Sequence, residues 1–242
     1  MAQQRRTPVV DPRVAERRRS LYIKIAAAVV LIAVAVGIGT WAVLSNKSST
    51  GGSAAVSVAT DNAYRITTAP AGSDPVKLTI IEDFQCPACR QFEQQFGPVI
   101  AELRQNPKVA VDYMPIAFLD RMSTTDYSSR SANASACVAE STAKNGDWTT
   151  WLKFHDSLYA NQPEEGGAGL SDDELNNLAK QAGAQNIKQC ITDRQFGGFV
   201  EETTKKANAT GTPTVRINGQ DVQLSTPEAL RDAVLNAVPN PQ

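Results

Sequence analysis

The sequence predicts an α/β fold in which a block of helices interrupts a sheet, with one membrane-spanning helix ahead of it. Three observations predict this arrangement. Short apolar, β-rich segments alternate with a segment of helical periodicity in residues 64–118. Helical patterns then run from about residue 124 to 206 before strand character returns. Finally, residues 25–44 contain no charged side chain.

The uncharged segment 25–44 is the first element. Twenty helical residues span about 30 Å, the thickness of the apolar core of a bilayer. Seven basic and two acidic side chains precede it in residues 1–24, and Lys47 is the only basic residue between it and Arg65. This bias predicts a cytoplasmic tail (1–24), a transmembrane signal anchor (25–44) and an extracytoplasmic C-terminal domain, hence a single-pass cell-membrane protein. A cleaved signal peptide is the alternative.

A linker and one folded domain follow the anchor. Ser, Gly and Ala dominate residues 45–59, which predicts a flexible linker over residues 45–62. The domain is expected over residues 63–240, long enough to bury one substantial core. Its helical insertion is expected at about 123–206.

The first half of that domain predicts strands around one helix. Residues 64–68 predict a short edge strand, and residues 76–84 are β-rich and mostly apolar, as in a central buried strand. A helix follows directly, and Pro98 is expected to kink it. Residues 109–118 predict the next strand.

The second half predicts helices first and a hairpin later. Ser171 and Glu174 match a capping box at a helix start, and Gly183 is expected to end that helix. His155 lies on an apolar helix face, where we expect it to pack and to hydrogen-bond between helices, beside three core aromatic residues: Trp148, Trp151 and Tyr159.

The last elements are a hairpin and a helix. Strands are predicted at residues 214–218 and 221–224, joined by a tight turn at Asn218 and Gly219. Pro227 is expected to begin the final helix.

Composition and charge exclude several classes of function. Hydrophobic residues make up 42% of the chain and charged residues 20%, which excludes wholesale disorder. Residues 1–24 carry 7 − 2 = +5, so with a net charge of −1 the rest of the chain carries −6. An acidic domain has no basic surface for a phosphate backbone, so no nucleic-acid partner is expected. The single histidine excludes any site that needs two imidazoles.

Cys86 and Cys89 form a C-x-x-C pair at the junction of a predicted strand and helix. Such a pair can be half a zinc site, a structural disulfide or a redox couple. Zinc needs four ligands, and Cys137 and Cys190 are far from the pair and from each other, so no metal is expected. A structural bridge across so short a loop stabilises little. The redox couple is therefore the favoured interpretation, and it needs no cofactor.

The helix start gives the two thiols different properties. Unpaired N–H groups and the positive end of the helix dipole favour a thiolate at Cys86, the expected attacking thiol. Cys89 lies one turn further in, on the apolar face, and is the expected resolving thiol. Glu82 and Asp83 precede the pair, and we expect one of them to be a solvated charge at the strand end. A proton acceptor is the alternative.

Four motifs occur in a characteristic order between residues 76 and 238: residues 82–93 around C-x-x-C, Tyr-Met-Pro at 113–115, WLKFHD at 151–156 with Asn-Gln at 161–162, and Gly-Thr-Pro-Thr at 211–214. In these motifs the sequence resembles the DsbA-like thiol–disulfide oxidoreductases of the thioredoxin superfamily. The resemblance implies a thioredoxin fold with an inserted helical domain.

The resemblance also implies roles for individual residues. Pro213 is implied to be the cis-proline that faces the C-x-x-C pair, and an ordinary turn is the alternative. The backbone of Thr212 is then free to bind an extended client segment by strand addition. Two positions depart from the pattern of the family. Ala88 stands where strong oxidants often have histidine, and Ile80 stands where thioredoxins have a buried acid.

The remaining cysteines, Cys137 and Cys190, are expected to form a structural disulfide. An oxidising compartment outside the cytoplasm disfavours unpaired cysteines, and each of the two lies in an amphipathic segment. Two separate buried thiols are the alternative.

Together these features predict an extracytoplasmic disulfide oxidoreductase that oxidises unfolded or reduced exported proteins. The resemblance implies reoxidation by a membrane protein of the DsbB or vitamin K epoxide reductase type. A dedicated reductase, as in cytochrome maturation, is one alternative. A non-catalytic client-binding domain with a static cysteine bridge and a copper chaperone are the others.

Overall fold

The structure, a computed structural model, describes residues 52–223 and 225–239. The predicted cytoplasmic tail (1–24), transmembrane helix (25–44) and first part of the linker lie outside these residues. Among the helices that are described, none combines the length and the apolar character that a membrane span requires.

The order of elements is the predicted one: two strands, a helix, a strand, a helical block, two strands and a helix. The strands are β1 (Tyr64–Thr67), β2 (Val76–Glu82), β3 (Val109–Pro115), β4 (Thr214–Ile217) and β5 (Gln220–Asp221). The helices are α2 (Pro87–Leu103), α3 (Tyr127–Thr142), α4 (Thr149–Ala160), α5 (Asp172–Ala182), α6 (Lys188–Thr192), α7 (Gly197–Ala207) and α8 (Pro227–Asn236). A single 3-10 turn, Asp120–Met122, follows β3.

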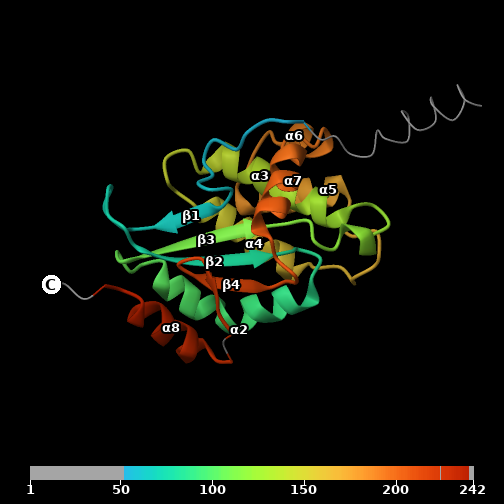
Figure 1. The fold of residues 1–242 in the computed structure, drawn as a ribbon. Helices are drawn as coiled ribbons and strands as arrows, with labels where there is room; N and C mark the ends of the chain where they lie inside the picture. Colours follow the sequence, from blue (N-terminus) through green and yellow to red (C-terminus); the bar gives the residue numbers. More distant parts are fainter. Residues whose placement is uncertain (1–51, 224, 240–242) are drawn as a thin grey trace, which may run out of the picture. The chain divides into compact units, whose positions relative to one another are not determined.

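The strands form one mixed sheet in the order β1-β3-β2-β4-β5 (Figure 1). β2 lies at the centre, parallel to β3 and antiparallel to β4, and β1 is an edge strand, as predicted. The last strand is shorter than predicted and begins one residue earlier, because the turn at Asn218 and Gly219 pairs Gln220 with Ile217.

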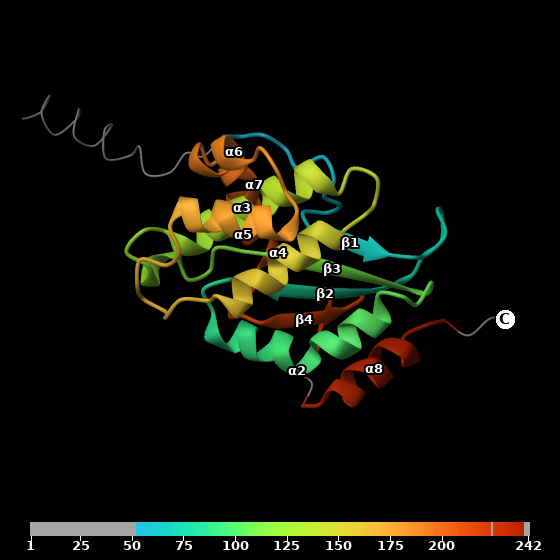
Figure 2. The ribbon, with the colours of Figure 1, turned by 180° about the vertical axis from the view of Figure 1, so that it is seen from behind.

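One face of the sheet carries the main core. Ile80 lies opposite Tyr113 on β3 and Val215 on β4, and all three side chains are buried. Helices α2, α4 and α8 lie on this side, in front of the sheet in Figure 2. Trp151 of α4 packs on Tyr113, so the helical insertion joins the core of the sheet.

The opposite face is only partly covered. Ala207, at the end of α7, packs with Ile81 and Ile116 in a small separate apolar cluster. Helix α7 therefore covers the end of this face that lies next to the C-terminus of β2.

The local signals for turns and caps are confirmed. Ser171 and Glu174 form the predicted capping box, and Gly183 ends α5 with a positive φ of 117°. Asn218 and Gly219 both have positive φ, at 49° and 81°, as a tight hairpin turn requires. Pro227 opens α8, directly after the capping residue Thr226.

Residues 52–62 differ from the flexible linker that their composition predicted. Val56 is only 5% exposed, and Ser57 donates from its N–H and its hydroxyl to the carboxylate of Glu140 on α3, at 2.7 and 2.8 Å. A side chain at Gly52 would meet the backbone oxygen of Gln195 at 2.6 Å. The small residues serve close backbone packing here, so this part of the predicted linker belongs to the folded domain.

Candidate active site

The C-x-x-C pair lies where the central strand gives way to a helix. Cys86 is the N-cap of α2, in extended conformation, and Pro87 occupies the first helical turn. The Cys86 thiol donates a hydrogen bond to the carbonyl oxygen of Thr212 at 3.3 Å. The Thr212–Pro213 peptide bond is cis. The fold thus brings together the two motifs that the sequence places 126 residues apart.

The two thiols are free in this structure and differ in their acidity. The pKa of Cys86 is lowered to about 6, chiefly by the hydrogen bond from Cys89, with smaller contributions from Thr212 and from the N–H groups of the first turn of the helix. Burial and the charge of Cys86 raise the pKa of Cys89 well above its ordinary value. At neutral pH, Cys86 is therefore mainly a thiolate and Cys89 a thiol, which matches the expected attacking and resolving roles.

Asp83 organises the turn between β2 and α2. Its carboxylate accepts hydrogen bonds from the N–H groups of Gln85 and Leu119, both at 2.8 Å. Its own N–H donates to the Cys89 sulfur at 3.5 Å. Burial raises the pKa of Asp83 to about 6.

The expectation that one of Glu82 and Asp83 is solvated is wrong, since both are 0% exposed. Glu82 ends β2 and points into the helical insertion. One of its carboxylate oxygens pairs with His155 Nε2 at 2.9 Å, and the other accepts a hydrogen bond from the hydroxyl of Tyr159 at 3.0 Å. His155 is buried, as expected, but it bonds to a strand carboxylate instead of a second helix.

Sequence reasoning missed this contact because Glu82 and His155 are 73 residues apart. The available signal was a lone histidine on an apolar helix face together with an acid at the end of an apolar strand.

Glu82, Glu93 and His155 are also the residues whose spacing is compatible with a metal ion, among the residues that the structure describes. One ligand atom from each lies within 4.8 Å of the others. However, the donor atoms of Glu82 and His155 already hydrogen-bond to each other. The cysteines are not part of this cluster.

The other two cysteines, Cys137 on α3 and Cys190 on α6, are joined by a disulfide, with their Cα atoms 6.0 Å apart. Both lie in the helical insertion, away from the sheet. The aromatic residues predicted to form the core of the insertion, Trp148, Trp151 and Tyr159, are all buried.

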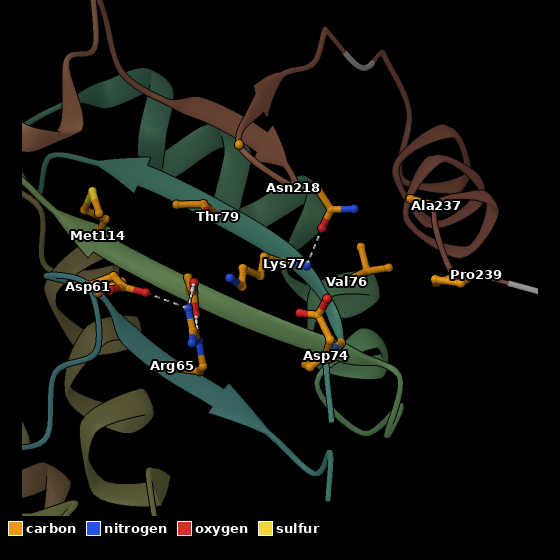
Figure 3. Close-up of a pocket in the computed structure, with 14 residues that line it drawn as sticks. Asp61, Arg65, Asp74, Val76, Lys77, Thr79, Met114, Asn218, Ala237 and Pro239 are labelled. Atoms are coloured by element: carbon orange, nitrogen blue, oxygen red, sulfur yellow. Dashed lines mark hydrogen bonds and ion pairs between the residues drawn. The ribbon is translucent and has the colours of Figure 1, made fainter. Parts of the chain in front are cut away.

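A cleft of about 460 Å³ opens on the less covered face of the sheet (Figure 3). Its lining includes Arg65, Asp112 and Lys77. The Arg65 guanidinium donates two hydrogen bonds, of 2.8 and 2.7 Å, to the carboxylate of Asp112. No cysteine or histidine lines this cleft. The Arg65–Asp112 pair joins strands β1 and β3, and Asn218 Oδ1 accepts a hydrogen bond from the N–H of Lys77 on β2.

A reduced thiol pair at a helix N-terminus, facing a cis-proline loop on this sheet, defines a thioredoxin-fold thiol–disulfide oxidoreductase. The family model described as Thioredoxin matches residues 71–236. The chain belongs to this family, and its relatives place it in the DsbA-like branch.

Three relatives illustrate the likeness. The oxidised DsbA of Mycobacterium tuberculosis is 34% identical, with a TM-score of 0.65 over 74% of this chain and 93% of that one. The reduced disulfide bond oxidoreductase DsbG of the same organism is also 34% identical, with a TM-score of 0.64 over 73% and 89%. Disulfide bond formation protein D of Bacillus subtilis (strain 168) is 23% identical over 160 residues, 63% of this chain and 68% of that protein.

Proposed function

We propose that this protein introduces disulfide bonds into exported proteins outside the cytoplasm, through Cys86 and Cys89. The observation that carries the proposal is the Cys86 thiol at the start of α2, with its pKa lowered to about 6 and its sulfur 3.3 Å from the backbone of Thr212. A stabilised thiolate favours the reduced enzyme, and this makes the corresponding disulfide oxidising. The names of the relatives in Bacillus and Mycobacterium support this direction.

The reaction uses the two cysteines in turn. A client thiolate attacks Cys86 in the Cys86–Cys89 disulfide, and Cys89 leaves and takes up a proton. A second client thiolate then attacks the client sulfur of the mixed disulfide. Cys86 leaves as a thiolate, so two electrons pass from the client to the enzyme.

Client binding is proposed at the cis-proline loop. The backbone of Thr212 precedes Pro213 and faces Cys86, so an extended client segment can pair with it as an added strand. Main-chain recognition of this kind suits an enzyme that serves clients of many sequences.

The anchor and the reoxidising partner complete the proposal. Residues 25–44 hold the enzyme at the outer face of the cell membrane. There, a membrane protein of the DsbB or vitamin K epoxide reductase type reoxidises the pair. A reporter fused after Gln242 tests the topology, since it should be active only outside the cytoplasm. Activity of that fusion in the cytoplasm would refute the proposed location.

The decisive experiment uses single cysteine variants and a client protein that carries an accessible disulfide, which the Cys86 thiolate attacks with release of one client thiolate. Cys89→Ala should accumulate mixed disulfides with the client on a non-reducing gel, whereas Cys86→Ala should accumulate none. Client complexes through Cys89 in the Cys86 variant would reverse the assigned roles. The absence of complexes and of thiol exchange in every variant would favour a client-binding domain.

The reduction potential separates oxidase from reductase. A value near about −120 mV indicates a DsbA-like oxidant, and one near about −270 mV a thioredoxin-like reductase such as those of cytochrome maturation. We expect a value toward the oxidising end, short of the strongest oxidants, because Ala88 supplies no cation between the cysteines.

A further inference from the structure

Three side chains from separate elements each place one potential metal ligand around a common point in the interior. Glu82 ends β2, Glu93 lies in α2 and His155 lies in α4. A carboxylate oxygen of each glutamate and a ring nitrogen of His155 all lie within 4.8 Å of one another. Imidazole and carboxylate groups are ligands that Zn²⁺ and its first-row neighbours accept in proteins. We call these three residues the Glu–Glu–His triad.

Glu93 is the member of the triad that indicates a ligand. Its Oε1 is buried and accepts no hydrogen bond from the residues that the structure describes. Arg104 lines the same cleft as Glu93, but it donates to the hydroxyl of Tyr113 at 2.6 Å. A buried carboxylate oxygen without a partner costs free energy, and a bound cation removes that cost.

The separation of Glu82 and His155 fits coordination of one ion. Glu82 Oε1 and His155 Nε2 are 2.9 Å apart. With metal bonds of about 2.1 Å to both atoms, the angle between the bonds is about 90°, as in five- and six-coordinate sites. Ligand atoms on opposite sides of such an ion are about 4.2 Å apart. The spread of the triad therefore closes around an ion with a small rotation of the Glu93 side chain.

The two fully buried members are already oriented as metal ligands are. His155 Nδ1 and Asp156 Oδ1 are 3.2 Å apart, so the ring presents Nε2 to the triad. The hydroxyl of Tyr159 donates to the second carboxylate oxygen of Glu82 at 3.0 Å. A carboxylate behind a ligating histidine and a hydrogen bond behind a ligating carboxylate are the usual outer contacts of a metal site.

A cleft of about 440 Å³ between α2 and α4 gives an ion access to the triad. Glu93 lines this cleft together with Asp156, the outer contact of His155. Arg90 and Arg104 line it as well. With Glu82 behind them, the carboxylates around the cleft outnumber these two cations, so a divalent ion is not repelled from the opening.

We infer that the Glu–Glu–His triad binds one divalent first-row transition-metal ion, with water from the α2–α4 cleft completing its coordination. The ion takes the place of the hydrogen bond between Glu82 and His155 and joins the sheet, the active-site helix and the helical insertion. The expectation of no metal concerned the four cysteines, and none of them is a ligand here. The ligands come from three elements, so no spacing motif in the sequence indicates them.

The test measures binding of ZnCl₂ to the full chain, without an affinity tag and in its oxidised form. Both cysteine pairs are then disulfides, so no thiol competes for the ion. The protein is treated with a chelator and dialysed, and isothermal titration calorimetry then gives the stoichiometry and the dissociation constant. We expect one ion per chain. The absence of saturable binding would overturn the inference. The assay involves no thiol exchange, so its outcome is independent of the proposed function.

The variant Glu93→Gln tests the ligand that is easiest to change without harm to the fold. Its Oε1 has no partner to lose among the described residues, so circular dichroism should show a folded protein. Its dissociation constant for Zn²⁺ should rise by about tenfold or more, as for loss of a metal-site contact. Glu102→Gln is the matched control, since this exposed acid of the same helix pairs with Arg231 and should leave binding unchanged. Equal effects of the two substitutions would show binding to surface carboxylates and overturn the inference.

X-ray absorption at the zinc edge identifies the ligand atoms without any variant. His155 is the single histidine of the chain, so scattering from one imidazole ring assigns it directly. We expect nitrogen and oxygen neighbours at about 2.0–2.2 Å. Sulfur neighbours at about 2.3 Å, or oxygen neighbours without an imidazole, would place the ion elsewhere and refute the site.

Discussion

The side-chain amide nitrogen of Gln162 donates a hydrogen bond of 2.9 Å to the carbonyl oxygen of Cys86. The same nitrogen donates to the carbonyl oxygen of Phe84 at 3.0 Å. Gln162 lies in the loop after α4, and the two carbonyl groups flank the turn that presents the attacking thiol. The helical insertion therefore supports the active-site turn as well as extending the fold.

Replacing Gln162 by Ala should loosen this turn. The loss of two hydrogen bonds to backbone carbonyls is expected to cost about 1–3 kcal/mol of the free energy of unfolding. Urea denaturation measures this cost, and faster amide hydrogen exchange at residues 84–86 would locate it. Asn161→Ala is the matched control, because that amide bonds only within its own helix end, to Ser157. Equal effects of the two substitutions would contradict the supporting role of Gln162.

The acidity of Cys86 should depend on Cys89. Thiolate absorbance of the reduced protein should titrate with a pKa of about 6, far below the ordinary value for a cysteine thiol. In Cys89→Ala the Cys86 pKa should rise, because the largest stabilising contribution is the hydrogen bond from the Cys89 thiol. Iodoacetamide alkylation rates against pH give the same quantity independently. A wild-type titration near the ordinary value would be incompatible with the proposed oxidant.

The Cys137–Cys190 disulfide should stabilise the protein without taking part in turnover. It closes a loop of 53 residues, for which the chain-entropy relation gives about 4 kcal/mol. The double substitution to Ala should lower the free energy of unfolding by up to this amount. Thiol–disulfide exchange at Cys86 and Cys89 should persist in this variant, which separates a structural role from a catalytic one. Loss of that exchange in a variant that still folds would show that the pair takes part in turnover.

His155 should make stability fall as the pH rises. Burial alone would lower the pKa of His155, but the charge of Glu82 and the hydrogen bonds that His155 donates to Asp156 and Glu82 outweigh it and raise the pKa to about 10. The folded state then holds a proton that the unfolded state releases near pH 6.5, so this stabilisation is complete below pH 6.5. It is lost progressively as the pH rises toward 10.

Denaturation of wild type and His155→Gln at several pH values between 6 and 9 isolates this contribution. The difference in unfolding free energy between the two proteins should shrink steadily with rising pH. Lys153→Gln, on the same helix but on its exposed surface, is the control and should show no such trend. A difference that is independent of pH would mean that His155 is neutral in the folded state.

Val56 should contribute to stability although it lies in a Ser- and Gly-rich segment. Val56→Ala removes two buried carbon atoms, worth about 1–2 kcal/mol at about 0.8 kcal/mol for each buried methylene. Thermal or urea unfolding measures the loss. Val58, two residues further on, is only half-buried, so Val58→Ala should cost less. Equal and negligible effects would restore the linker interpretation for residues 52–62.

The sequence alone determined the features that depend on neighbouring residues. The hairpin at Asn218 and Gly219 and the capping box at Ser171 need only local backbone preferences. The position of Cys86 at a helix start followed from the periodicity of the next seventeen residues. The pairing of Cys137 with Cys190 was predictable because only two cysteines remained outside the C-x-x-C motif.

Only the tertiary structure decided the features that join distant segments. Glu82 meets His155 across 73 residues, and Gln162 reaches Cys86 across 76. Composition described residues 52–62 correctly as small and polar, yet Val56 is buried. In each case the physical reason is the same. A polar side chain is buried only where the fold supplies a hydrogen-bond partner, and an apolar one only where the fold supplies an apolar surface, so the outcome depends on contacts between distant segments.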